Sequence, residues 1–179
     1  MNVFMINNRP AQSGIGVHTF SLYDELIKIN PNIELRLWDG RIVEKMYSRV
    51  RDDRYLEKIE EIVRLSSHLS WLLSLRAKNN VLYHFTNAAL SVGSLLYHPS
   101  IVTVHDLVPV HSPRSPVDKL IALSMGCLHN ADKIICVSQY VKKDLNKLLK
   151  IKNCEVIYNG VDHQIFKKRK KKEVRKLLN

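Results

Sequence analysis

Short apolar runs alternate along this chain with longer segments in which apolar residues recur at helical spacing. Short runs rich in β-branched residues and bounded by Gly, Pro or Asn are typical of strands. In one of them apolar and charged residues alternate, which indicates a strand with one exposed face. The pattern predicts strands at residues 3–6, 33–37, 81–85, 101–104, 133–137 and 155–158.

The segments between these runs carry the helical period. Pro31 follows the first of them, Pro116 is placed for the first turn of another, and Ser138 is a good N-cap for a third. The pattern predicts helices at residues 16–30, 116–130 and 139–150, one long amphipathic helix or two within residues 41–79, and a loop or short helix at residues 87–97.

Strands that alternate with helices favour an α/β fold with a doubly wound, mostly parallel sheet and helices on both of its faces. The 179 residues suffice for one domain with a proper core. A content of 45% hydrophobic and 25% charged residues is ordinary for a globular protein, which excludes a chain that is disordered throughout.

The sequence also bears on location and redox state. No apolar run approaches the roughly 18–20 residues needed to span a bilayer. The N-terminus lacks the basic segment and long apolar core of a signal peptide, so we expect a cytosolic protein. The cysteines Cys127, Cys136 and Cys154 are widely spaced among apolar neighbours, which favours reduced core thiols over disulfides or a zinc site.

The net charge of +11 is concentrated near the C-terminus, where residues 167–176 carry eight basic and one acidic side chain. Such a run can bind nucleic acid or anionic lipid head groups by charge alone, or it is simply a solvated end. No interleaved aromatic residues or recognition-helix motif accompany it. We therefore expect no nucleic-acid partner.

Polar residues follow the carboxyl ends of several predicted strands, which is where ligands bind in open parallel α/β sheets. His105 and Asp106 follow one strand, and Thr86 and Asn87 follow another. The alternative for the His-Asp pair is that it caps the strand and starts a turn. The hydroxyl of Ser138 could bind a ligand oxygen, although helix capping alone also explains this serine.

Gly14 and Gly16 flank Ile15 between the first predicted strand and the first helix. Glycines let the backbone approach a ligand closely, and a helix N-terminus presents free N–H groups to an anion. The stretch resembles a phosphate-binding turn without the full G-x-G-x-x-G pattern, so an ordinary turn stays open as the alternative. His18, one turn further, either faces the same crevice or is a core or surface histidine.

Four phrases follow one another along the chain: Ser13-Gly14-Ile15-Gly16-Val17-His18, Val104-His105-Asp106-Leu107, Ile135-Cys136-Val137-Ser138-Gln139-Tyr140 and Val156-Ile157-Tyr158-Asn159-Gly160-Val161-Asp162. In this order they resemble the N-terminal half of family-four, retaining GT-B glycosyltransferases, the group-1 and mannosyltransferase-like enzymes. The resemblance covers nearly the whole chain and is weakest between residues 41 and 79. Tyr158 stands where that family often has proline.

The resemblance implies a Rossmann-like, acceptor-side domain at residues 1–165, with residues 166–179 as a basic linker and the start of a C-terminal donor domain. Such an enzyme transfers a hexose from a nucleotide sugar to a glycan or lipid-linked acceptor with retention, and it needs no cofactor or metal. The donor-side carboxylates have no counterpart in this sequence, so we expect the chain alone to be inactive. The alternative is a non-catalytic half-domain that binds an acceptor or a partner chain.

The resemblance also implies roles for individual residues. His105 matches the histidine that contacts the donor sugar near the reacting carbon, and Asp106 beside it is the second expected catalytic residue. The residues expected to bind donor phosphates or acceptor are Gly14, Ile15, Gly16, His18, Thr86, Asn87 and Ser138, and those expected between the domains are Asn159, Gly160 and Asp162.

Residues 51–78 combine basic side chains with the apolar Trp71, Leu72 and Leu73. Many members of the family act on lipid-linked acceptors, so this segment is a candidate for peripheral contact with the inner face of a membrane. The alternative is that its apolar stripe packs on the sheet.

Overall fold

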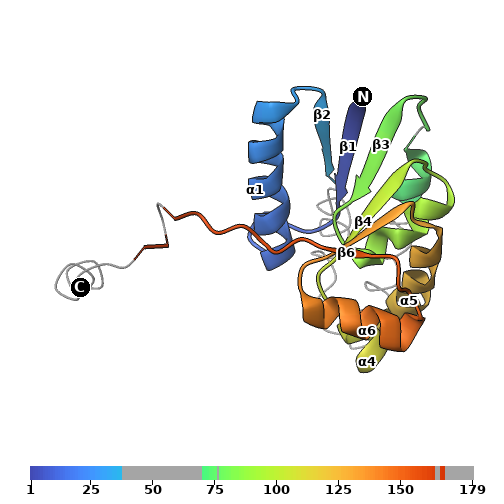
Figure 1. Cartoon of the computed structure of the whole chain (residues 1–179). Helices are drawn as coiled ribbons and strands as arrows, with labels where there is room; N and C mark the ends of the chain where they lie inside the picture. Colours follow the sequence, from blue (N-terminus) through green and yellow to red (C-terminus); the bar gives the residue numbers. More distant parts are fainter. Residues whose placement is uncertain (38–69, 76, 164–165, 168–179) are drawn as a thin grey trace, which may run out of the picture.

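The computed structural model describes residues 1–37, 70–75, 77–163 and 166–167 and is built on a parallel β-sheet (Figure 1). Within these residues the sheet has six strands, and every neighbouring pair is parallel, as predicted. In their order across the sheet the strands are β2 (Ile33–Leu37), β1 (Asn2–Asn7), β3 (Val81–Phe85), β4 (Ser100–Val104), β5 (Lys133–Cys136) and β6 (Glu155–Val156).

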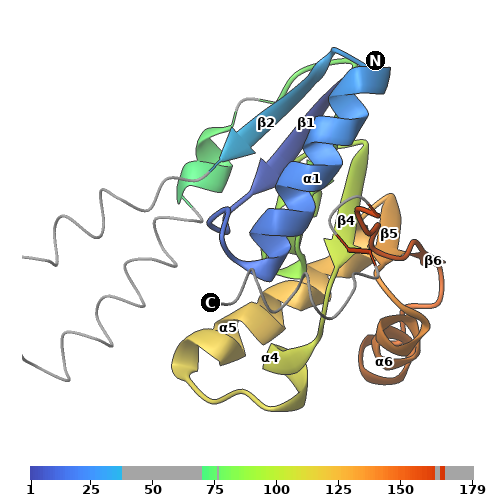
Figure 2. The same ribbon diagram turned by 90° about the vertical axis from the view of Figure 1, so that its left-hand side faces the viewer.

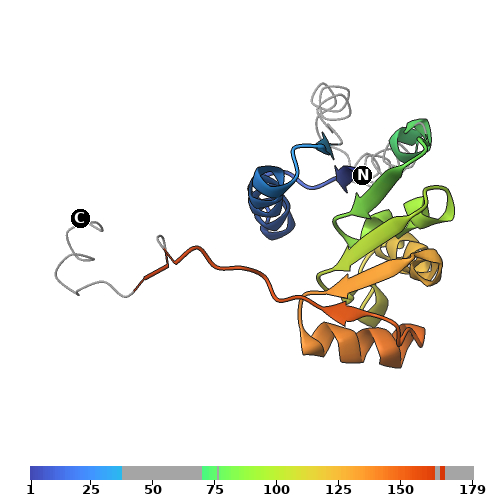
Figure 3. The same cartoon turned by 45° about the horizontal axis from the view of Figure 1, so that its top comes forward.

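Helices cover both faces of the sheet, which confirms the doubly wound prediction (Figures 2 and 3). Helix α1 (Gly14–Ile29) connects β1 to β2 on one face. From β3 onward the chain steps across the sheet in the opposite direction, and because parallel crossovers are right-handed, the later helices fall on the other face. These are η1 (Ala88–Leu95), α4 (Val108–His111), α5 (Pro116–Ser124), η2 (Met125–Asn130) and α6 (Gln139–Leu149).

The main hydrophobic core lies between the sheet and the later helices. Side chains alternate between the two faces of a strand, so every second residue of the central strands enters this core. The residues between them face α1 and include the buried Met5, His84 and Thr103. The fully buried members of the main core include Ile6, Tyr83, Phe85, Val102 and Val104 from strands and Leu90, Leu128 and Leu145 from helices.

Helix α1 begins at Gly14, two residues before the predicted start at Gly16. Ser13 is its N-cap, and the Ser13 Oγ accepts a hydrogen bond from the Gly16 N–H at 3.0 Å. Both glycines therefore lie in the first helical turn rather than in the turn before it, and neither has a positive φ. The hydrogen bond from the Gly16 N–H to the Ser13 side chain therefore sets the start of the helix.

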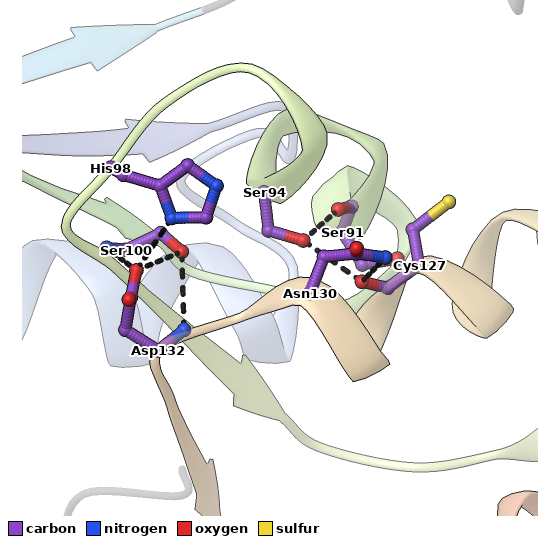
Figure 4. Close-up of polar contacts among 7 residues, drawn as sticks. All are labelled: Ser91, Ser94, His98, Ser100, Cys127, Asn130 and Asp132. Carbon is purple, nitrogen blue, oxygen red and sulfur yellow. Dashed lines mark hydrogen bonds and ion pairs between the residues drawn. The ribbon is translucent and has the colours of Figure 1, made fainter.

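The helix predicted at residues 116–130 divides into α5 and η2. Ser91 Oγ donates to the Ser124 carbonyl at 2.7 Å. Ser94 Oγ donates to the Cys127 carbonyl at 2.9 Å (Figure 4). These bonds from η1 compete with the α-helical ladder at the junction of the two elements. Of the two alternatives for residues 87–97, the structure has the helical one, as η1. Helix α4 was not predicted, and β6 is shorter than the strand predicted at residues 155–158.

A polar cluster fastens the start of β4 to the start of β5 at the amino edge of the sheet (Figure 4). The Asp132 carboxylate accepts from the Ser100 N–H at 2.7 Å and from the Ser100 hydroxyl at 3.1 Å. His98 Nδ1 lies 2.7 Å from the same carboxylate oxygen. Because the buried serine contacts the aspartate rather than the histidine, this cluster is a structural clamp and not a nucleophilic triad.

Most of the segment predicted as amphipathic helix within residues 41–79 lies outside the described residues, as does the basic run after residue 167. Residues 70–74 are helical. Leu72 is fully buried in the core and Trp71 packs against that core, whereas Leu73 is exposed. In this part the apolar stripe thus packs on the domain. Across the described ranges, no helix has the length and apolar character that crossing a bilayer requires.

Candidate functional site

A cavity opens at the edge of the sheet where the strands end, between the loops that follow β1, β3 and β4. Parallel strands bring all their carboxyl ends to this edge, so residues far apart in sequence meet here. Among the predicted site residues, Ile15, Asn87, His105 and Asp106 lie together in its wall. The full lining is Arg9, Ile15, Asn87, Ala88, Ala89, His105, Asp106, Pro109, Ile121 and Met125.

Side-chain hydrogen bonds tie the end of β1 to the end of β3 beside this cavity. The Thr86 hydroxyl lies 3.1 Å from the Ile6 carbonyl and 3.2 Å from Asn7 Oδ1. Asn87 Nδ2 donates to Asn8 Oδ1 at 2.6 Å, and Asn87 Oδ1 caps η1. The Thr86 hydroxyl is thus buried and already bonded. Asn87 lines the cavity, and it too is buried, with both polar atoms of its side chain hydrogen-bonded.

Arg9 is a lining residue that the sequence interpretation missed. The Asn7 side chain bonds both polar groups of the Arg9 backbone. Asn7 Nδ2 donates to the Arg9 carbonyl at 2.8 Å, and the Arg9 N–H donates to Asn7 Oδ1 at 3.1 Å. A basic residue beside Pro10, directly after the first strand, was the available signal. Arg9 is the basic residue among those that line the cavity.

The two glycines of α1 have different surroundings. A Cβ on Gly16 would lie 1.9 Å from the Pro10 carbonyl oxygen, so this glycine is required by the packing of the loop on the helix. A Cβ on Gly14 would meet no atom within 4 Å. Gly14 therefore leaves open space at the helix N-terminus, while Gly16 has a structural explanation. Neither glycine lines the cavity.

Three histidines gather between α1 and the sheet. His18, on α1, packs against His105, which follows β4; their ring centroids are 4.8 Å apart and the planes are inclined at 80°. His84, on β3, is buried, and its Nε2 lies 2.8 Å from the Thr103 hydroxyl. The structure therefore brings His18 to the predicted catalytic histidine and adds His84, which had not been singled out.

The surroundings of these histidines favour their neutral forms. Burial lowers the pKa of His105, opposed by its hydrogen bond to the Thr86 carbonyl and by the Asp106 carboxylate. Burial and then repulsion from His105 lower the pKa of His18. Burial lowers the pKa of His84 to about 4, with smaller contributions from His18 and His105. Burial disfavours the charged form of each ring.

The hydrogen bond of His105 defines its tautomer. His105 Nε2 lies 3.1 Å from the Thr86 carbonyl oxygen, and a carbonyl can only accept. The proton of the neutral ring is therefore on Nε2, and Nδ1 carries the free lone pair. His105 thus offers a hydrogen-bond acceptor at Nδ1.

Asp106 keeps most of its carboxylate available. One oxygen, Oδ1, accepts from the Val108 N–H at 3.1 Å at the start of α4, and the residue is exposed in the cavity wall. The turn-forming alternative considered for this residue is therefore realised, without using up the acceptor capacity of the carboxylate.

The remaining predicted site residues lie elsewhere. Ser138 Oγ accepts from the Val141 N–H at 3.2 Å, so this serine caps α6, and it does not line the cavity. Asn159, Gly160 and Asp162 are exposed on the segment that runs out from the sheet after β6 (Figure 1). Their interdomain role stays a prediction.

Throughout the ranges that the structure describes, no set of three or more His, Cys, Asp or Glu side chains is arranged to hold a metal ion. Among the clustered histidines, His18 and His105 contact each other's rings, and the Nε2 atoms of His105 and His84 contact the Thr86 carbonyl and the Thr103 hydroxyl.

A family model described as Glycosyltransferase Family 4 matches residues 13–165. The matched residues include α1 with His18, the lining residues from η1 and the end of β4 with His105. None of the curated proteins compared with the chain matches it. The family match spans most of the sequence, and the parallel sheet with its cavity at the carboxyl ends agrees with it. The chain belongs to Glycosyltransferase Family 4.

Proposed function

We propose that this chain is the acceptor-side domain of a retaining GT-B glycosyltransferase that moves a hexose from a nucleotide sugar to a glycan or lipid-linked acceptor. The supporting observation is the placement of His105 and Asp106 in one cavity at the carboxyl edge of the sheet, in a chain of this family. In this proposal a donor-binding domain faces that edge and completes the cleft.

His105 and Asp106 would act on the sugar. The free lone pair of His105 Nδ1 accepts a hydrogen bond from a sugar hydroxyl, and the Asp106 carboxylate stabilises positive charge that develops at the reacting carbon. Glycosyl transfer passes through an oxocarbenium-like transition state. A neutral His105 adds no positive charge beside that cation, so the lowered pKa of His105 fits this role.

The surrounding residues would bind the rest of the substrates. Arg9 and the open backbone at Gly14 supply a cation and helix N–H groups, which suit a phosphate. Asn87 contacts the acceptor in this proposal by exchanging its present side-chain bonds to Asn8 and Ala89 for bonds to the substrate. Ala89 and Pro109 give an apolar wall that fits the C–H face of a sugar ring. The proposed site needs no metal for these steps.

A transfer assay tests the proposal. The chain is joined to a donor domain of the same family and supplied with UDP- and GDP-hexoses together with glycan and lipid-linked acceptors. We expect His105→Ala to lower the transfer rate by about 10²–10³-fold, because it removes a group placed against the transition state. The matched control is His129→Ala, an exposed histidine of η2, which should transfer at the wild-type rate.

The outcomes are distinct. Near wild-type transfer by a folded His105→Ala variant contradicts the catalytic role of His105. Inversion at the anomeric carbon, read by NMR of the product, contradicts retention. Acceptor binding by the joined protein without any transfer supports the non-catalytic half-domain instead.

A further inference from the structure

His18 and His105 come from elements far apart in the sequence and contact each other edge to face. Their ring centroids are 4.8 Å apart, with an interplanar angle of 80°. This T-shaped geometry is one of the favoured arrangements of two aromatic rings. Rotating either ring gives up the contact, so each restrains the orientation of the other.

His18 has a feature that its own hydrogen bonding does not explain. In the described part of the chain, His18 Nδ1 is one of two buried side-chain polar atoms without a hydrogen-bond partner, the other being Arg36 Nε. Burying a nitrogen without a partner opposes folding, and such a group in a folded protein calls for an explanation. The ring contact with His105 is a favourable interaction of His18 that offsets the cost of burying this nitrogen.

His105 is held on its other side by the backbone. Its Nε2 donates to the Thr86 carbonyl at 3.1 Å. His105 is half-buried in the cavity wall, and no residue in the described part of the chain makes a hydrogen bond to its Nδ1. The imidazole is thus fixed between the Thr86 carbonyl and the His18 ring, with one nitrogen left for a ligand.

We propose that His18 is a positioning residue for His105: its ring holds the His105 Nε2–H against the Thr86 carbonyl and so keeps Nδ1 as the acceptor presented to a sugar hydroxyl. This inference rests on the proposed transfer reaction for its purpose. Its direct consequence, a single tautomer of His105, can be measured without any transfer.

The titratable and charged groups around His105 come from four places in the fold. They are His18 on α1, His84 on β3, Asp106 after β4 and Arg9 after β1. Burial lowers the pKa of all three histidines, and Asp106 opposes that shift for His105. Near neutral pH the rings are therefore uncharged, so the tautomer decides what His105 offers to a ligand.

The test is ¹H–¹⁵N imidazole spectroscopy on the ¹⁵N-labelled 179-residue chain, which reports the tautomer and titration of each histidine. We expect His105 to be in the Nε2–H form. In His18→Ala we expect two interconverting tautomers and a higher titration midpoint for His105, because water reaches the exposed ring face. His18→Phe keeps an aromatic ring in contact with His105 and should keep the single tautomer.

His129→Ala is the matched control and should leave the His105 signals unchanged, because His129 is exposed on η2. If amide spectra show that His18→Ala does not fold, His18→Gln replaces it, with the same expected result. A folded variant without the ring that keeps one tautomer and the wild-type midpoint overturns the proposal, as does loss of the tautomer in His18→Phe. If the tautomer responds but no nucleotide hexose supports transfer, the positioning contact stands and the proposed function fails.

Discussion

His84 is a titratable residue that the fold accepts only in its neutral form. It lies on β3 between β1 and β4, and 7% of the residue is exposed. Its Nε2 is 2.8 Å from the Thr103 hydroxyl, which satisfies that nitrogen without any charge. Burial, followed by the neighbouring His18 and His105, lowers the pKa of His84 to about 4.

Protonation of His84 should therefore destabilise the folded protein in mild acid. In the unfolded chain this histidine takes up a proton below its ordinary pKa of 6.5, whereas in the folded chain it resists protonation until about 4. The contribution of neutral His84 to the free energy of unfolding is fully present above pH 6.5 and is lost as the pH falls from 6.5 to about 4. We expect the free energy of unfolding to drop by about 3 kcal/mol, measured by urea titration at a series of pH values.

His84→Gln is the control, because it removes the titrating group from the same strand position. Its unfolding free energy should vary much less over the window, with a residual slope from His18 and His105, whose pKa values are also lowered. A variant that keeps the full wild-type slope contradicts the assignment to His84.

At the scale of an element, the start of α1 is packed against the loop that leads into it. Ser13 Oγ donates to the Pro10 carbonyl at 2.8 Å while accepting from the Gly16 N–H at 3.0 Å. The same Pro10 carbonyl occupies the space where a side chain at Gly16 would begin. The loop that presents Arg9 to the cavity is therefore fixed by the first turn of the helix.

Alanine substitutions at Gly16 and Gly14 should separate these two positions. Gly16→Ala places a Cβ 1.9 Å from the Pro10 carbonyl oxygen, so we expect a loss of about 1–3 kcal/mol in unfolding free energy. Gly14→Ala enters open space and replaces a poor helix former, so we expect no loss and a gain of up to about 1 kcal/mol. Urea unfolding near neutral pH measures both.

The pair serves as its own control, because both variants add one methyl group within the same helical turn. Equal stabilities for the two variants would show that the close approach of the Pro10 carbonyl does not govern this turn. A loss in Gly14→Ala alone would contradict the open space at that position.

At the scale of the molecule, the two edges of the sheet have different tasks. The amino edge is clamped by Asp132, which holds the starts of β4 and β5 together, while the carboxyl edge carries the cavity. The core between them is closed: Cys136 on β5 is fully buried, and Cys154 before β6 is 6% exposed. Cys127, on η2, is half-buried.

The rate of thiol modification should report how deeply each cysteine is buried. Burial raises the pKa of Cys136 to about 12 and also raises that of Cys127, so accessibility rather than acidity decides the order. With an aromatic disulfide reagent we expect one thiol, Cys127, to react in the native protein. Cys136 and Cys154 should react only as the domain opens, and all three should react at once in guanidinium chloride.

Cys127→Ser should remove the fast phase and leave the slow one unchanged. Rapid reaction of two or three thiols in the native wild-type chain would contradict the packing of β5 and of the residues before β6.

Much of the fold followed from local sequence patterns. The β-branched runs and the alternation at residues 33–37 predicted the strands because a strand places successive side chains on opposite faces. The parallel arrangement followed from strands alternating with helices. The break between α5 and η2 did not follow, because the carbonyls at this junction are bonded by Ser91 and Ser94, which lie 33 residues away in sequence.

The candidate site divides in the same way. The sequence alone determined that His105 and Asp106 directly follow a strand. Because parallel strands have their carboxyl ends at one edge of the sheet, this also placed the pair at that edge. Only the tertiary structure decided which polar groups are free. It bonds the Thr86 hydroxyl to β1, brings Arg9 into the cavity and packs His18 against His105. A local pattern fixes where a residue lies along its own element, but its neighbours come from other elements, so the chemistry of the site depends on the packing of the whole domain.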